Sequence, residues 1–333
     1  MQTTLPHPLL PCDPPFWARG GQLQTIVAQY LPCPAPDLPW QRRTLALEDG
    51  DQLALRLLPG SSGVSVLLFH GLGGSADGHY IRSIAALLHA EGHSVLAVNH
   101  RGAGEGRGLA QAPYHGGSTR DVAAVLALGR RVFPGQLQVA VGFSISANML
   151  LLLLGRDGAL GLPDRVIAVN PPADLETCSR RLDQGFNQAW DRYFLWCLRQ
   201  EVEGRSLTPA LGPTQTLRAF DQLYTAPQAG FSDCQAYYDQ CSCGPHLRHI
   251  TVPTVIISSL DDPFAPAADL LQRQLSPAIH LHTELTGGHM GYVTRNLPGY
   301  RWLDYALEHY VTALKDLGRP AAWSQWPVEE KAG

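Results

Sequence analysis

The chain has 333 residues, which fits one large domain or two ordinary ones, since domains commonly hold ~100–200 residues. With 25 basic and 29 acidic residues, the net charge of −4 is too small to favour nucleic acid or an anionic membrane as a partner. A content of 45% hydrophobic and 16% charged residues excludes global disorder. The 33 glycines and 26 prolines follow no repeat period, so they predict many tight turns.

The N-terminal residues 1–40 are rich in proline and predict a wrap around a larger body, with a helix only within 21–30. Trp17, Ile26 and Leu31 are its predicted anchors. No basic region followed by an apolar stretch is readable in it, so we expect no secretory signal. The longest apolar run in the chain is far below the ~20 residues of a membrane span, and we expect a cytoplasmic protein.

The segments that follow alternate between apolar strands and helical patterns. An acidic-glycine turn at 48–51 joins two alternating runs and predicts a β-hairpin. Further strands are predicted at 64–69, 94–98, 137–141, 165–169, 254–258 and 280–285, and helices at 80–91, 119–132, 145–154, 267–274 and 300–317. This alternation indicates an α/β fold whose mainly parallel sheet is covered by helices on both faces.

Residues 172–249 interrupt this alternation, because they carry many aromatic residues at helical spacing and no strand pattern. We therefore expect one α/β core, 41–171 and 250–317, with 172–249 inserted as a helical cap. The polar residues 318–333 are expected to form a C-terminal tail.

Seven scattered cysteines predict reduced, mostly buried thiols. Cys241 and Cys243 have the wrong spacing for a zinc site, and no second cysteine pair accompanies them. The histidines also lack metal-ligand spacing. We therefore expect no metal site.

A serine at the junction of strand 137–141 and the next helix suggests a nucleophile. Ser144 lies in the sequence Gly142-Phe-Ser-Ile-Ser-Ala147, where a strained turn would expose its hydroxyl. Ser146 stands where the usual motif has glycine, and an ordinary strand-to-helix turn is the alternative. Ser146 is the poorer nucleophile, because its own following neighbours do not fit the motif.

The glycine-rich loop after strand 64–69, His70-Gly-Leu-Gly-Gly74, matches the loop that supplies an oxyanion donor in such enzymes. The backbone amides of Leu72 and Ile145 are the predicted oxyanion hole. A phosphate-binding loop is excluded because the required lysine and glycine spacing are missing.

A serine nucleophile needs a base and an acid that orients the base. His289 follows strand 280–285 between glycines, and Asp261 and Asp262 follow strand 254–258, in the chain order Ser, Asp, His. We prefer Asp262 as the orienting acid because it leads directly into a Pro-Phe-Ala-Pro turn, and we expect Asp261 to cap the loop. Asp261 as the orienting acid is the alternative.

Several further residues are predicted to line the site. They are His70, Gly71, Phe143, His115 and Met290, although for the two histidines purely structural roles are the favoured interpretation. His100 is read as a loop residue.

With these residues in hand, the sequence resembles the α/β-hydrolase superfamily and, within it, the AB hydrolase 4 family of YheT-like esterases. The resemblance runs from about residue 15 to 314 and rests on segments such as Gly21–Ile26, His70–Gly74, Asn99–Gly102, Tyr114–Gly117, Gly142–Ser144 and Asp261–Phe264. It implies a mostly parallel eight-stranded sheet with a helical cap, a Ser144–Asp262–His289 triad, and hydrolysis of a carboxylic ester without a cofactor.

The sequence therefore predicts a serine esterase that forms an acyl-enzyme on Ser144 and acts on a small-molecule ester with short to medium apolar groups. A thioesterase, amidase or acyltransferase using the same triad is one alternative. A non-catalytic binding protein on a hydrolase fold is another, because fold does not prove activity. The sequence leaves the physiological substrate and the oligomeric state open.

Overall fold

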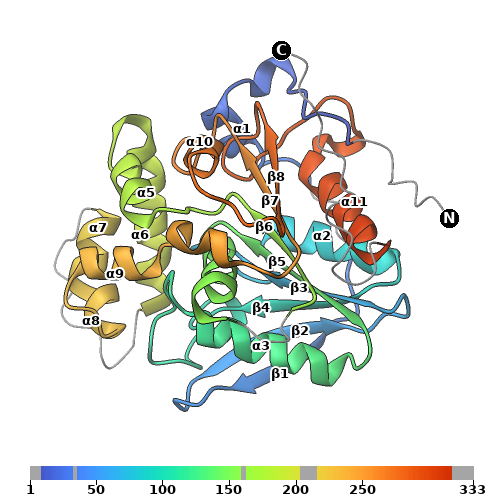
Figure 1. Ribbon diagram of the computed structural model, residues 1–333, viewed down its shortest axis with the longest axis horizontal. Helices are drawn as coiled ribbons and strands as arrows, with labels where there is room; N and C mark the ends of the chain where they lie inside the picture. Colours follow the sequence, from blue (N-terminus) through green and yellow to red (C-terminus); the bar gives the residue numbers. More distant parts are fainter. Residues whose placement is uncertain (1–8, 33–35, 159–162, 203–215, 317–333) are drawn as a thin grey trace.

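A mixed eight-stranded sheet forms the centre of the computed structural model (Figure 1), which describes residues 9–32, 36–158, 163–202 and 216–316. The strand order is β1-β2-β4-β3-β5-β6-β7-β8. The β1–β2 and β2–β4 pairs are antiparallel, and all other pairs are parallel. The strands are β1 (Gln41–Ala46), β2 (Gln52–Leu58), β3 (Val64–Phe69), β4 (Ser94–Asn99), β5 (Leu137–Phe143), β6 (Arg165–Val169), β7 (Thr254–Ser259) and β8 (Ile279–Glu284).

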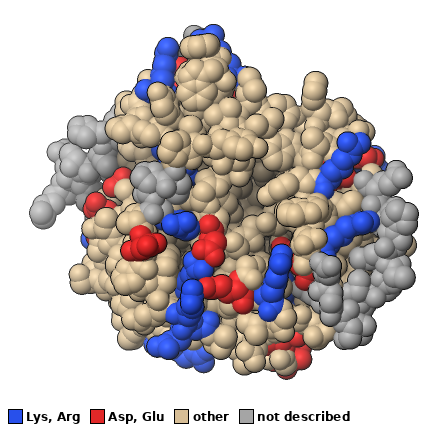
Figure 2. Space-filling model, turned by 180° about the vertical axis from the view of Figure 1, so that it is seen from behind, with Lys and Arg blue, Asp and Glu red and all other residues tan. Residues whose placement is uncertain are grey.

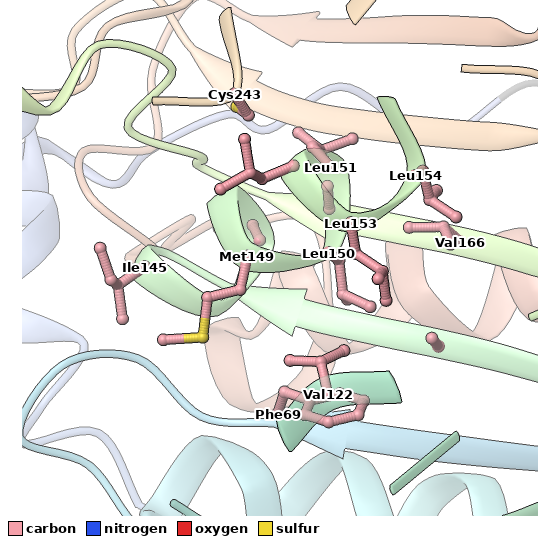
Figure 3. Close-up of a cluster of buried hydrophobic side chains, with 14 of the residues drawn as sticks. Phe69, Val122, Ile145, Met149, Leu150, Leu151, Leu153, Leu154, Val166 and Cys243 are labelled. Carbon is pink, nitrogen blue, oxygen red and sulfur yellow. The ribbon is translucent and has the colours of Figure 1, made fainter. Parts of the chain in front are cut away.

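Helices cover both faces of the sheet because its central strands are apolar on both sides. Alternate residues of one strand enter different cores: Leu67 and Phe69 of β3 join one cluster, while Val66 and Leu68 join the other. The first cluster is covered by α3 (Thr119–Val132) and α4 (Ile145–Leu152), and the second by α2 (His79–Ala90) and α11 (Trp302–Asp316). Figure 3 shows side chains of α4 packed between Phe69 and Val122 on one side and Cys243 on the other.

The segment between β6 and β7 is helical and lies to one side of the sheet (Figure 1). Its helices are α5 (Leu175–Leu182), α6 (Gln188–Val202), α7 (Leu217–Phe220), α8 (Ala226–Gln228) and α9 (Cys234–Cys241). They have an apolar cluster of their own, which includes Leu195, Phe220 and Tyr224. A short helix of the N-terminal segment, α1 (Gly21–Val27), and α10 (Ala267–Leu271) complete the fold.

This architecture confirms the predicted α/β fold and its mostly parallel, eight-stranded sheet. The described cysteines are free and mostly buried. The helix predicted at 267–274 is shorter than expected. The tail 318–333 lies outside the described residues.

The predicted N-terminal anchors are partly wrong. Trp17 and Ile26 remain 39% and 42% exposed, whereas Gln24 and Thr25 are buried. Gln24 is buried because its side chain is hydrogen-bonded: it donates to the carbonyls of Ala18 and Val293 and accepts from the Val293 amide. Hydrogen bonds therefore hold the N-terminal segment against the C-terminal part of the core.

Acidic and basic side chains are interspersed on the face shown in Figure 2, so that face carries no patch of a single sign. In the described part of the chain, no helix is long and apolar enough to span a bilayer.

Candidate active site

Ser144 occupies a strained turn between β5 and α4. Its φ of 53° is in a region that residues with a side chain rarely adopt, and its amide donates to the Val169 carbonyl at 2.8 Å. A side chain at Gly142 would collide with Leu150 and with the backbone of residues 146 and 147. The crowded backbone therefore requires glycine at this position and holds Ser144 in the sharp turn.

His289 lies next to this serine, with its Nε2 atom 2.8 Å from Ser144 Oγ. Its other ring nitrogen, Nδ1, is 2.8 Å from Asp262 Oδ2. A carboxylate only accepts, so Nδ1 carries the proton and Nε2 is free to accept the serine hydroxyl. Residues from three separate strand ends thus form one hydrogen-bonded chain at the carboxyl edge of the sheet.

Asp262 is fixed by four donors. Besides His289, the Asn170 side-chain amide donates to Oδ2 at 2.8 Å, and the backbone amides of Phe264 and Ala265 donate to Oδ1 at 3.0 and 2.8 Å. Burial favours the neutral acid, but His289 and these amides outweigh it and lower the pKa of Asp262 below its ordinary value. The carboxylate is therefore ionised when it holds the imidazole.

The neighbouring Asp261 has a different task. Its Oδ1 atom accepts the amides of Gly287 and Gly288 at 2.9 and 2.8 Å, so it fastens the loop that leads into His289. Thr25 of α1 adds a second support, because its hydroxyl accepts the His289 amide at 2.9 Å.

Two amides near Ser144 are available as oxyanion donors. Among the described residues, the N–H groups of Leu72 and Ile145 have no hydrogen-bond acceptor. Gly71 brings their two segments together: a Cβ placed there would be 3.3 Å from the Ser144 Cβ. The Tyr80 hydroxyl accepts the Gly71 amide at 2.9 Å and holds the loop.

Ser146 packs behind this loop and is fully buried. Its hydroxyl donates to the His70 carbonyl, so it accepts from His100 Nε2 at 2.7 Å. The His100 amide in turn donates to His70 Nε2 at 3.2 Å, which leaves the His70 Nδ1 proton for the Gly71 carbonyl at 2.7 Å. Burial lowers the pKa of both imidazoles, that of His100 to about 4, so both are neutral.

Two hollows meet at Ser144. The first, which we name the cap cavity, has mainly apolar walls. Its lining includes Leu72, Ile145, Leu175, Leu182, Phe194 and Leu217. The second, which we name the outer cleft, opens between α1 and α6 and is lined by Thr25, Gln29, Trp190, Tyr193, His289 and Met290.

The predicted lining residues divide into two groups. Gly71 and Met290 line the outer cleft, and His115 lines the cap cavity. His70 and Phe143 are fully buried and line neither hollow. The His70 ring hydrogen bonds within its own loop, and the Phe143 ring lies 5.0 Å from that of Tyr80, so both support the site from behind.

The sequence did not predict the contacts of Asn170 and Thr25 with the site, or the hydrogen bond between Ser146 and His100. Asn170 had a usable signal, because it directly follows strand 165–169 and so reaches the same sheet edge as the other site residues. The contacts of Thr25 and His100 depend on segments far apart in the chain and had none. No group of three or more metal-ligating side chains occurs within the described ranges.

Comparison with known proteins places this geometry in a family. Residues 64–295 match the family model of the alpha/beta hydrolase fold. The chain is 30% identical over 288 residues to the Escherichia coli protein named "Putative esterase YheT", covering 82% of this chain and 84% of that protein. It is 23% identical over 325 residues to human "Phospholipase ABHD3", covering 92% of this chain and 79% of that protein.

The fold also recurs among solved structures. The esterase PF2001 of Pyrococcus furiosus aligns with a TM-score of 0.58 at 16% identity, covering 84% of this chain and 92% of that one. The match of the family model over most of the chain and the similarity to YheT along nearly its full length lead to one conclusion. The chain belongs to the α/β-hydrolase family, in its YheT-like branch.

Proposed function

We propose that this hydrolase-family protein is a serine esterase that cleaves small carboxylic esters through an acyl-enzyme on Ser144. The observation that carries the proposal is the 2.8 Å contact between Ser144 Oγ and His289 Nε2, at the point where the two hollows meet. The similarity to the protein named "Putative esterase YheT" supports the same reaction class.

In the proposed mechanism, His289 takes the Ser144 proton while the serine oxygen attacks the ester carbonyl. Asp262 holds the imidazole in the required tautomer and stabilises its charge. The Leu72 and Ile145 amides stabilise the tetrahedral oxyanion, each by roughly 3–4 kcal/mol. His289 then gives its proton to the leaving alcohol, and water releases the acyl group by the same steps in reverse order.

The two hollows suggest how the substrate lies. His289 must protonate the leaving oxygen, and it lines the outer cleft but not the cap cavity. We therefore assign the leaving alcohol to the outer cleft and the acyl group to the cap cavity. Residues 172–249 act in this view as the cap over the core 41–171 and 250–317, because α5, α6 and α7 supply much of the cavity wall. Apolar walls favour a short to medium apolar acyl group.

Labelling with a fluorophosphonate probe tests the nucleophile. We expect stoichiometric labelling that peptide mapping locates on Ser144, none in Ser144→Ala, and full labelling in the matched control Ser146→Ala. Hydrolysis of p-nitrophenyl butanoate and octanoate should be lost in Ser144→Ala alone. Unlabelled wild-type protein without ester hydrolysis would instead support a binding protein. Faster turnover of thioesters, amides or added alcohol acceptors would reassign the bond that is cleaved.

A further inference from the structure

The cap cavity, which Ser144 also lines, carries polar side chains of the inserted helices in its wall. Asp221, Ser179 and Tyr238 all line it and belong to three different segments of residues 172–249. The Tyr238 hydroxyl donates to Asp221 Oδ2 at 2.8 Å, and Ser179 Oγ lies 3.2 Å from the same phenol oxygen. We name these three side chains the polar trio.

Among the described residues, Asp221 forms no ion pair. The Arg218 guanidinium pairs with Glu176 of α5 and favours the charged form of Asp221 less than burial opposes it. Burial, opposed by hydrogen bonds from Thr225 and Tyr238, raises the pKa of Asp221 to about 6, and the Asp191 carboxylate adds to the rise. At neutral pH the trio therefore contains a buried negative charge.

This carboxylate keeps acceptor capacity that the protein does not use. An ionised carboxylate has about four lone-pair sites and accepts only. Within the described residues, Tyr238 and Thr225 donate to it, which leaves sites for donors from the cavity that it lines. A plain alkyl chain that reaches Asp221 would displace water and supply no hydrogen-bond donor. A hydroxyl or ammonium group would donate a hydrogen bond in place of the displaced water.

We propose that the polar trio binds a hydrogen-bond donor at the far end of the acyl group, so that preferred substrates are esters of ω-hydroxy or ω-ammonium acids. This substrate class rests on the proposed function, since it requires the acyl group to be attached to Ser144. The trio adds a binding contact and takes no part in bond cleavage.

The test compares p-nitrophenyl esters of straight-chain acids from butanoate to dodecanoate with their ω-hydroxy and ω-ammonium counterparts. For the full-length wild-type protein we expect kcat/KM to favour one ω-substituted series by about tenfold, ~1.4 kcal/mol, at the chain length that reaches Asp221. Asp221→Leu should abolish the preference for both series. Asp221→Asn should abolish it for ammonium but keep it for hydroxyl, since an amide oxygen still accepts.

Asp191→Asn is the matched control. Asp191 is also a buried carboxylate of the inserted helices with a raised pKa, but its oxygens accept the Leu217 amide and it does not line the cap cavity. This variant should keep the wild-type preference.

Fluorophosphonate labelling of each variant separates the two proposals, because it reports Ser144 and is independent of the acyl chain. Should Asp221→Leu not fold, as judged by circular dichroism, Asp221→Asn on the ammonium series decides the question. Equal kcat/KM for plain and substituted esters at every length in labelled wild-type protein would overturn the inference. So would a preference that is unchanged in folded Asp221→Leu, or an ammonium preference that is unchanged in Asp221→Asn.

Discussion

Two serines that lie two residues apart, Ser144 and Ser146, each form a hydrogen bond with a histidine. The oxygen–nitrogen distances in the two pairs are nearly equal. Ser144 Oγ is 2.8 Å from His289 Nε2, and Ser146 Oγ is 2.7 Å from His100 Nε2. The direction of the proton differs. His289 accepts from Ser144, because Asp262 holds the other ring proton, whereas His100 donates to Ser146, whose own proton goes to the His70 carbonyl.

Access differs as well. Ser144 lines both hollows, while Ser146 and His100 are almost completely buried. Only the Ser144 oxygen therefore lies where a ligand in the hollows can reach it, as the proposed mechanism requires. The comparison shows that a short serine–histidine distance does not identify a nucleophile; the acid behind the histidine and the final acceptor of the serine proton do.

Replacing the two histidines gives the largest expected contrast. His289→Gln removes the base, so kcat/KM for p-nitrophenyl butanoate should fall by ~10⁴–10⁶. His100→Gln removes only a buried support and should cost less than about tenfold. Comparable losses in the two variants, measured on protein shown to be folded, would contradict the distinction between the pairs.

The next contrast is between the two adjacent aspartates. Asp262→Asn should lower kcat by ~10⁴, because an amide in place of the carboxylate favours the wrong imidazole tautomer. Asp261→Asn keeps an acceptor for the loop amides and should lower kcat by less than about tenfold. Steady-state kinetics on both variants decides the assignment, and the reverse order would move the orienting role to Asp261.

Truncating Ser146 should affect the free energy of unfolding more than the rate of ester hydrolysis. Ser146→Ala leaves the His100 Nε2 proton and the His70 carbonyl buried without partners, which should cost ~1–3 kcal/mol of unfolding free energy. Urea denaturation measures this cost. We expect kcat to change by less than about tenfold, and a loss as large as that of His289→Gln would show that Ser146 takes part in the reaction.

The smallest expected effect is a pH dependence. Burial lowers the pKa of His100 to about 4, whereas in the unfolded chain it is close to 6.5, so the unfolded state gains a proton first as pH falls. The stabilisation that comes from burying neutral His100 is fully present above the pKa of the unfolded chain and is lost as pH falls below it. Between about pH 7.5 and 5.5 the wild type should lose roughly 1 kcal/mol relative to His100→Gln. A difference in urea midpoints that does not change with pH would mean that His100 is not buried as a neutral base.

Much of the fold could be predicted from local sequence patterns. Strand 137–141 and helix 119–132 could be read from the sequence because period and breakers are local properties. The positions of Ser144, Asp262 and His289 at strand ends could be read in the same way. The supporting residues could not, since the Thr25–His289 bond joins positions 264 residues apart.

The α/β architecture, the candidate nucleophile and the order of the site residues could be predicted from the amino-acid sequence, because apolar periodicity and glycine turns act within a few residues of each other. Which hydroxyl donates to which imidazole, and that Asp221 lines the cavity, became clear only from the tertiary structure. These depend on how distant strand ends and the inserted helices meet, and no local pattern encodes such long-range packing.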